Sequence, residues 1–240
     1  MDEQRQELIE NFNHYHIGLD DTFAFKCRSC GKCCKNRDDI LLNSRDVYNI
    51  ATALDLTHEQ VIKRYSDVYI GGSSRLPVVR LKPKGVKNVC PLLANKRCSV
   101  HSLKPTVCAL FPLGRVMTAE GTPKEMGLSA PGKIAYILNP ANCGSARRKQ
   151  TVLNWLERFD ISIDDAFFIE WNKTIFELTS AIQKYEGKDA VTDKAMGMMW
   201  DGIFMALYID YDTQKEFYPQ FEVNATKILS IFSELGRFEF

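Results

Sequence analysis

Apolar residues recur at helical spacing along the last third of the chain. Four segments carry apolar positions three and four residues apart, which is typical of amphipathic helices. Ser162 and Asp165 form a capping-box pattern before the second of them, and Gly187 follows its end. The four segments are 147–159, 162–185, 193–209 and 221–235. The pattern predicts a helical region from about residue 147 to residue 240.

The preceding residues mix shorter periods of both kinds. Ser44 is a predicted N-cap for a helix through residue 54, and Thr57 with Gln60 forms a capping box for the next helix. Alternation in residues 75–83 predicts a strand. Further predicted elements are an amphipathic helix at 3–14, a turn between two short extended pieces at 90–98, and two strands within 115–140.

These elements predict an α+β fold with a compact cysteine-rich, metal-binding region of short strands. We expect that domain at about residues 20–146, followed by the helical C-terminal region at 147–240, and the two can share one core. Of the 240 residues, 45% are hydrophobic and 25% charged, so a sizeable core is available without disulfide staples.

No apolar run approaches the roughly 18 to 20 residues that a membrane helix needs. The first residues, "MDEQRQELIENF", are acidic and do not resemble the basic and apolar start of a signal peptide. We therefore expect a cytoplasmic protein without a membrane partner.

Eight cysteines dominate the candidate chemistry, four of them within the segment "FKCRSCGKCCKN". In a reducing compartment, clustered cysteines bind metal or do chemistry more often than they form disulfides. Adjacent Cys33 and Cys34 rarely pair with each other, because disulfide geometry fits poorly across one peptide unit. The predicted metal ligands are Cys27, Cys30, Cys33, Cys34, Cys90, Cys98, Cys108 and Cys143.

The cysteines fall into a C-x2-C-x2-C-C block and a later, dispersed block. Gly31 lets the first loop adopt the positive φ that tight turns around metal need. Eight thiolates suffice for up to two four-ligand sites, but the order of the cysteines does not show which of them share a site. Iron–sulfur clusters and zinc both accept four thiolates. The single knuckle-like loop favours a [4Fe–4S] cluster, with zinc as the alternative.

Other roles for these residues stay open. His101, three residues after Cys98, is an alternative ligand or a packing residue, and either Cys33 or Cys34 can be a reactive thiol. Residues 1–150 carry 23 Lys and Arg against 14 Asp and Glu (+9), whereas residues 151–240 carry 8 against 16 (−8). The basic residues are spread along the first part, which disfavours nucleic acid as a partner. They can instead lower the pKa of the thiols.

The segments "FKCRSCGKCC" and "CPLLANKRCSVHSLKPTVCALFPL" resemble the YkgJ-type cysteine-cluster (CxxCxxCC) family, described as a zinc- or iron-chelating domain. The resemblance covers about residues 25–145. His101 stands where the family usually has Tyr, and Lys104 stands where it has Arg. The family's second block is matched by residues 90–93, 98–101, 104–105 and 108–112.

The resemblance also extends to flagellin lysine N-methylases, which contain a similar cysteine block. It implies a cluster-dependent enzyme that modifies a protein or peptide, with S-adenosylmethionine as the methyl donor. No G-x-G-x-x-G loop of a Rossmann-type site is present in the sequence. The alternative is a zinc-stabilised module that binds a protein or nucleic acid without catalysis.

Overall fold

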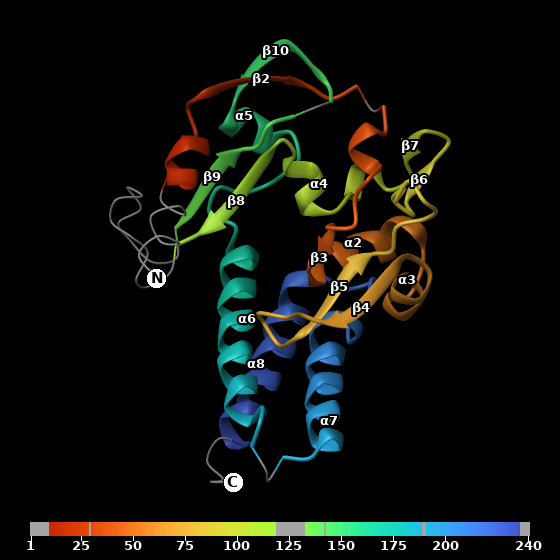
Figure 1. Ribbon diagram of the computed structural model, residues 1–240, viewed down its shortest axis with the longest axis vertical. Helices are drawn as coiled ribbons and strands as arrows, with labels where there is room; N and C mark the ends of the chain where they lie inside the picture. The colour runs from red at the N-terminus through yellow and green to blue at the C-terminus, as the bar shows by residue number, and fades with distance from the viewer. Residues whose placement is uncertain (1–9, 29, 119–132, 142, 189–190, 236–240) are drawn as a thin grey trace. The chain divides into compact units, whose positions relative to one another are not determined.

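The computed structural model describes residues 10–28, 30–118, 133–141, 143–188 and 191–235 (Figure 1). Its contacts divide the chain into two units, each built from two stretches that are distant in sequence. Unit 1 comprises Met1–Lys32 and Thr106–Ile169, and unit 2 comprises Cys33–Pro105 and Glu170–Phe240. Short strands precede a set of long helices, so the predicted α+β class is confirmed. The predicted domain division at residue 146 stays a prediction.

Unit 1 contains two small antiparallel sheets and short helices. One sheet has the strand order β1-β9-β8, and the other pairs β10 with β2. The elements are β1 (His16–Ile17), β2 (Thr22–Lys26), α4 (Thr106–Leu110), β8 (Leu113–Met117), β9 (Ile134–Leu138), β10 (Ser145–Thr151), α5 (Val152–Glu157) and the start of α6 (Ala166–Tyr185).

The core of unit 1 forms around Trp155 of α5. Phe23 and Phe25, which alternate along β2 with exposed residues, meet the indole edge-on at ring distances of 5.9 and 5.6 Å. The buried indole Nε1–H donates to the Leu110 carbonyl at 2.9 Å, so the polar end of the ring is satisfied. This core attaches β2 and α4, and with them two cysteine-bearing segments, to one scaffold.

Unit 2 combines a three-stranded antiparallel sheet, order β3-β5-β4, with a hairpin and a helical layer. Helix α8 packs against α6, with Trp171 and Phe221 at a ring distance of 6.2 Å, and it also approaches α7 (Figure 1). The elements are η1 (Lys32–Cys34), β3 (Leu41–Leu42), α2 (Ser44–Leu54), α3 (His58–Tyr65), β4 (Ser66–Ile70), β5 (Pro77–Leu81), β6 (Leu93–Ala94), β7 (Arg97–Cys98), η2 (His101–Leu103), α7 (Asp193–Phe204), a π-helical turn η4 (Met205–Ile209) and α8 (Phe217–Leu235).

Helix starts follow capping chemistry closely. Thr57 caps α3, and its capping box with Gln60 is confirmed. The predicted cap of α2 is wrong by one residue: Asn43 is the N-cap and forms the box with Asp46. Ser44 is the first helical residue, and its buried hydroxyl donates to the Leu207 carbonyl instead.

Two further expectations in the C-terminal part need correction. Residues 147–151 are not helical but belong to strand β10, because they pair with β2. Helix α6 begins at Ala166, and the Asp165 carboxylate accepts the Phe168 N–H at 3.3 Å, so Ser162 does not cap it. Gly187, at φ 78°, follows the end of α6 as predicted.

The other predicted elements are confirmed where the structure describes them. Strand β5 lies in the alternating segment, Asn95 and Lys96 turn between β6 and β7, and β8 and β9 are the two predicted strands. Of the predicted helix at 3–14, residues 10–14 are helical and the rest lies outside the described residues. None of the helices in the described part of the chain is long and apolar enough to cross a membrane.

Candidate metal centre

The eight cysteines divide evenly between the two units. All eight are thiols in the structure. Unit 1 holds Cys27, Cys30, Cys108 and Cys143, and unit 2 holds Cys33, Cys34, Cys90 and Cys98. The boundary between the units therefore falls inside the first cysteine block, between Cys30 and Cys33, which the spacing of the block does not indicate.

In unit 2, backbone hydrogen bonds connect the cysteine turn to the segment before Cys90. The Asn36 N–H donates to the Lys87 carbonyl at 3.0 Å, and the Cys90 N–H donates to the Cys34 carbonyl at 2.8 Å. Asn36 adopts a left-handed φ of 53°, which an Asn tolerates better than most residues. The turn thereby brings the two cysteine blocks of the sequence together.

A hairpin then returns Cys98 to the same region. Strands β6 and β7 pair Leu93 with Cys98, and the Leu93 N–H donates to the Cys90 carbonyl at 3.1 Å. The residues at the turn of the hairpin have positive φ, which allows so short a connection. Cys90 and Cys98 thus lie at the two ends of one hairpin.

The thiols of unit 2 influence one another electrostatically. A hydrogen bond from the Cys34 side chain, with the charges of Lys104 and Arg37, lowers the pKa of Cys33 to about 6. Burial raises the pKa of Cys90 and of Cys98, and a negative Cys33 raises both further. The backbone contacts and these electrostatic effects gather the four cysteines in one region of unit 2.

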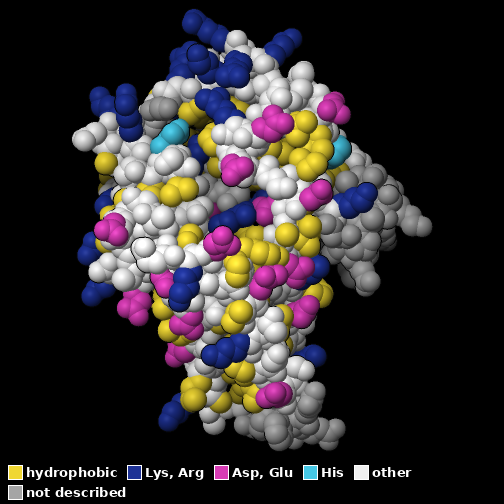
Figure 2. All heavy atoms as spheres, turned by 180° about the vertical axis from the view of Figure 1, so that it is seen from behind, with side chains coloured by type: hydrophobic (Ala, Val, Ile, Leu, Met, Phe, Trp, Pro, Cys, Tyr) yellow, Lys and Arg dark blue, Asp and Glu magenta, His cyan; other side chains and the backbone are white. Residues whose placement is uncertain are grey.

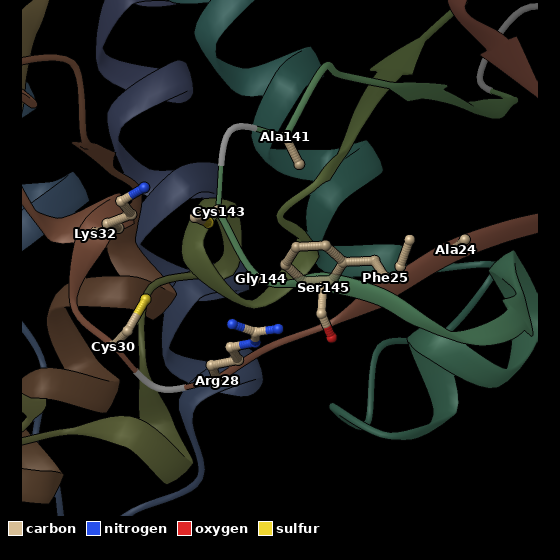
Figure 3. Close-up of a pocket in the computed structure, with 10 residues that line it drawn as sticks. Ala24, Phe25, Arg28, Cys30, Lys32, Ala141, Cys143, Gly144 and Ser145 are labelled. Atoms are coloured by element: carbon tan, nitrogen blue, oxygen red, sulfur yellow. The ribbon is translucent and has the colours of Figure 1, made fainter.

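In unit 1, the cysteines lie along the core and beside a pocket. Cys27 and Cys143 pack against the core around Trp155, and Cys108 lies in α4. Cys30 and Cys143 line a pocket of about 630 Å³, and the Arg28 side chain extends between Cys30 and Ser145 in this view (Figure 3). Gly144, at φ 78°, approaches β2 so closely that a Cβ atom there would lie 2.5 Å from the Phe25 ring.

The donor sets fit thiophilic metal. Four cysteine sulfurs per unit match the ligand number of zinc and of an iron–sulfur cluster, and neither set contains a carboxylate. Within the described ranges, no three His, Cys, Asp or Glu side chains are close enough to hold one ion together. His101, the alternative ligand, lies on the exposed turn η2. The assignment of all eight cysteines as ligands stays a prediction.

Comparison with known proteins shows what the cysteine-rich segment is similar to. Residues 26–130, less than half of the chain, match the CxxCxxCC family, described as "Putative zinc- or iron-chelating domain". The resemblance seen in the sequence is thus confirmed, and the match suggests a zinc- or iron-chelating role for this segment. An uncharacterized protein of Methanocaldococcus jannaschii is 29% identical over 113 residues, which are 45% of this chain and 56% of the relative. The alignment thus spans little more than half of that relative. No solved structure matches the chain significantly.

Lys104, which in the sequence is only a departure from the family pattern, is a functional candidate. Its ammonium helps to lower the pKa of Cys33, and it opposes the larger effect of burial, which raises the pKa of Cys98. The sequence feature that points to Lys104 is its position before Pro105, where the family usually has Arg. A positive charge at this position therefore favours the deprotonated, thiolate form of these cysteines.

Proposed function

We propose that this protein holds iron–sulfur clusters through cysteine thiolates, with one four-cysteine site in each unit. The observation that carries the proposal is the hydrogen bond from the Cys90 N–H to the Cys34 carbonyl at 2.8 Å, together with the β6–β7 hairpin that returns Cys98 towards Cys90. A hydrogen-bonded thiol with a lowered pKa is a ready thiolate ligand near neutral pH. The four thiols of unit 1 form the second set.

The choice of cluster over zinc rests on the closely spaced first block. Four cysteines within eight residues match a ferredoxin-like cluster loop better than two separated zinc knuckles. A bound cluster supplies one-electron chemistry, whereas a closed four-thiolate zinc site stabilises the fold and is redox-silent. A role in modifying a protein or peptide with S-adenosylmethionine, and the cytoplasmic location, stay predictions.

The test is metal and sulfide analysis of protein purified without oxygen, with an absorption spectrum of the same sample. We expect a brown protein with about four iron and about four sulfide per site. A colourless protein with tightly bound zinc and no sulfide contradicts the choice of cluster and leaves the chelating sites standing. Absence of both metals from freshly purified protein overturns the function itself.

Paired variants test the division between the units. Cys33→Ser with Cys90→Ser removes ligands from unit 2, and Cys30→Ser with Cys143→Ser removes ligands from unit 1. Each double variant is expected to lose about half of the iron, because the other site is intact. His101→Ala is the matched control and is expected to keep the full content. Complete loss of iron from both double variants would show that all the cysteines serve one site.

A further inference from the structure

Among the described residues, the pocket of unit 1 is lined by two cations and by the thiols of Cys30 and Cys143, and by no carboxylate. Arg28 and Lys32 contribute the charges, Ser145 contributes a hydroxyl, and Ala24 with Phe25 forms an apolar wall. Its volume of about 630 Å³ falls within the range of pockets that bind small molecules. Figure 3 shows these side chains around one opening. A ligand that enters it meets positive charge and an apolar surface together.

Strand pairing places more positive charge beside the pocket. Residues 145–151 pair antiparallel with β2, with Ser145 opposite Lys26 and Lys149 opposite Ala24. The register shifts between these pairs, so β10 carries an irregular stretch at Arg147 and Arg148, whose side chains are exposed. Figure 2 shows Lys and Arg side chains gathered over the part of unit 1 where Figure 1 places β2 and β10. The basic residues of two distant segments thus form one patch.

These charges are not compensated within the described part of the chain. No carboxylate there pairs with any of the six cations, which are Lys26, Arg28, Lys32, Arg147, Arg148 and Lys149. Elsewhere the protein does pair its arginines, as in Arg115 with Asp165 and Arg75 with Glu186. Unit 1 as a whole carries 11 Lys and Arg against 12 Asp and Glu. The positive field is therefore local to the pocket, and it attracts anions there.

The chemistry of the lining favours phosphate over a single carboxylate. A guanidinium binds two phosphate oxygens at once, and an ammonium supports the same group as a point charge. Six cations exceed what one carboxylate needs, but they suit a ligand with several negative charges. The remaining volume and the wall of Ala24 and Phe25 leave room for an apolar or planar portion. Because Phe25 is only 4% exposed, it does not offer the open stacking platform that single-stranded nucleic acid uses.

We propose that the unit 1 pocket binds a phosphorylated small molecule with at least two negative charges, such as a nucleoside diphosphate or triphosphate. Arg28 and Lys32 hold the phosphates inside the pocket, and Arg147 and Arg148 attract them from its margin. The proposal goes beyond the metal-binding function. Two proposed ligands, Cys30 and Cys143, also line the pocket, but the cations that hold the phosphates are not metal ligands.

The experiment measures displacement of a fluorescent ATP analogue from the full-length protein as purified. The competitors are ATP, ADP, AMP, inorganic phosphate and a 12-nucleotide single-stranded RNA. We expect affinity to rise with the number of phosphates and to fall with salt. We expect Arg28→Gln with Lys32→Gln to raise the Kd for ATP about tenfold or more, because charge-assisted bonds are lost. Arg147→Gln with Arg148→Gln is expected to raise it about threefold, and the effect should shrink at high salt.

The matched control removes the same charges from unit 2. Lys63→Gln with Arg64→Gln changes two exposed residues of α3 and is expected to leave the Kd for ATP unchanged. Equal ATP affinity in all three double variants and the wild type overturns the proposal. So does AMP binding as tight as ATP binding, or RNA binding tighter than that of any nucleotide. The last result assigns the patch to nucleic acid instead.

Iron content, measured on every sample, separates this proposal from the proposed function. Protein that keeps its metal but does not bind ATP overturns the pocket assignment alone. Protein that binds ATP but contains no metal overturns the metal function alone. If the change at Arg28 and Lys32 also disturbs the nearby cysteine loop, the variant at Arg147 and Arg148 decides, because it leaves that loop intact.

Discussion

The Arg115 guanidinium bonds the Asp165 carboxylate at 2.8 Å, with only 4% and 6% of the two side chains exposed. Arg115 also lies 3.7 Å from the centre of the Phe168 ring. Asp165 accepts the Phe168 N–H, so one carboxylate both starts helix α6 and neutralises a buried cation from β8. The pair therefore couples the sheet of unit 1 to the helix that follows it.

Removing one member of this pair is expected to leave an uncompensated buried charge. Arg115→Leu should lower the free energy of unfolding by about 3–5 kcal/mol, measured by urea denaturation. Adding Asp165→Asn to that variant neutralises the orphaned carboxylate and keeps an acceptor for the helix start. The double variant should recover about 1–2 kcal/mol. A double variant less stable than Arg115→Leu alone would show that the carboxylate acts through other contacts.

His58 is expected to make stability depend on pH. Burial lowers its pKa to about 4, its Nε2 has no hydrogen-bond partner among the described residues, and it stacks on Tyr211 at 5.4 Å. The unfolded chain takes up the proton near pH 6.5, whereas the native state resists it until about pH 4. The contribution is therefore complete above pH 6.5 and falls as the pH drops, by about 2 kcal/mol at pH 5.

The variant His58→Phe keeps an aromatic ring and removes the titration. The free energy of unfolding, measured from pH 7.5 to pH 5, should fall less steeply in the variant than in the wild type. The difference between the two curves isolates this residue, since all the other titratable groups are the same in both proteins. Parallel curves would mean that His58 takes up its proton at the same pH in the native and the unfolded state.

Gly144 and Gly187 have the same φ of 78° but different surroundings, which makes them a matched pair. An alanine at Gly187 meets no atom within 4 Å, so it should cost only about 1 kcal/mol for the left-handed backbone. An alanine at Gly144 would also lie 2.5 Å from the Phe25 ring and 2.9 Å from the Lys26 carbonyl. Gly144→Ala should cost at least about 2 kcal/mol more than Gly187→Ala in the free energy of unfolding. Equal costs would show that β2 and β10 separate easily.

Local chemistry explains what the sequence could predict about the fold. The capping box of α3 and the helical stripe of α8 lie within single segments, so their signals are complete there. The predictions that were wrong concern residues whose partners lie far away in the sequence. Residues 147–151 carry a helical pattern but pair with β2, and the Gln150 side chain donates to the Phe25 carbonyl, 125 positions away. Asn43 and Ser44 are equally good caps in isolation, and a contact with Leu207 decides between them.

The same distinction holds for the candidate site. Thiol chemistry and spacing sufficed to select the cysteines, because a dense cysteine block is a local property. Their division between two units is not local, since Cys27 and Cys143 meet only through the core around Trp155. The basic residues looked spread along the chain for the same reason, and only the pairing of Lys26 with Ser145 gathers them.

Lys104 provides a direct test of the electrostatics around Cys33. Because its ammonium favours the thiolates of Cys33 and Cys98, Lys104→Gln should raise the pKa of both thiols, and Lys104→Arg should preserve them. The hydrogen bond from Cys34 is the larger cause for Cys33 and remains in both variants, so the effect there is moderate. In metal-free protein at pH 6, alkylation of Cys33 by iodoacetamide should slow about two- to threefold in Lys104→Gln, as measured by peptide mass spectrometry.

Cys30 serves as the internal control, because it belongs to the other unit and its rate of alkylation should not change. If Lys104→Arg slows alkylation of Cys33 as much as Lys104→Gln does, the effect comes from packing of the lysine chain rather than from its charge.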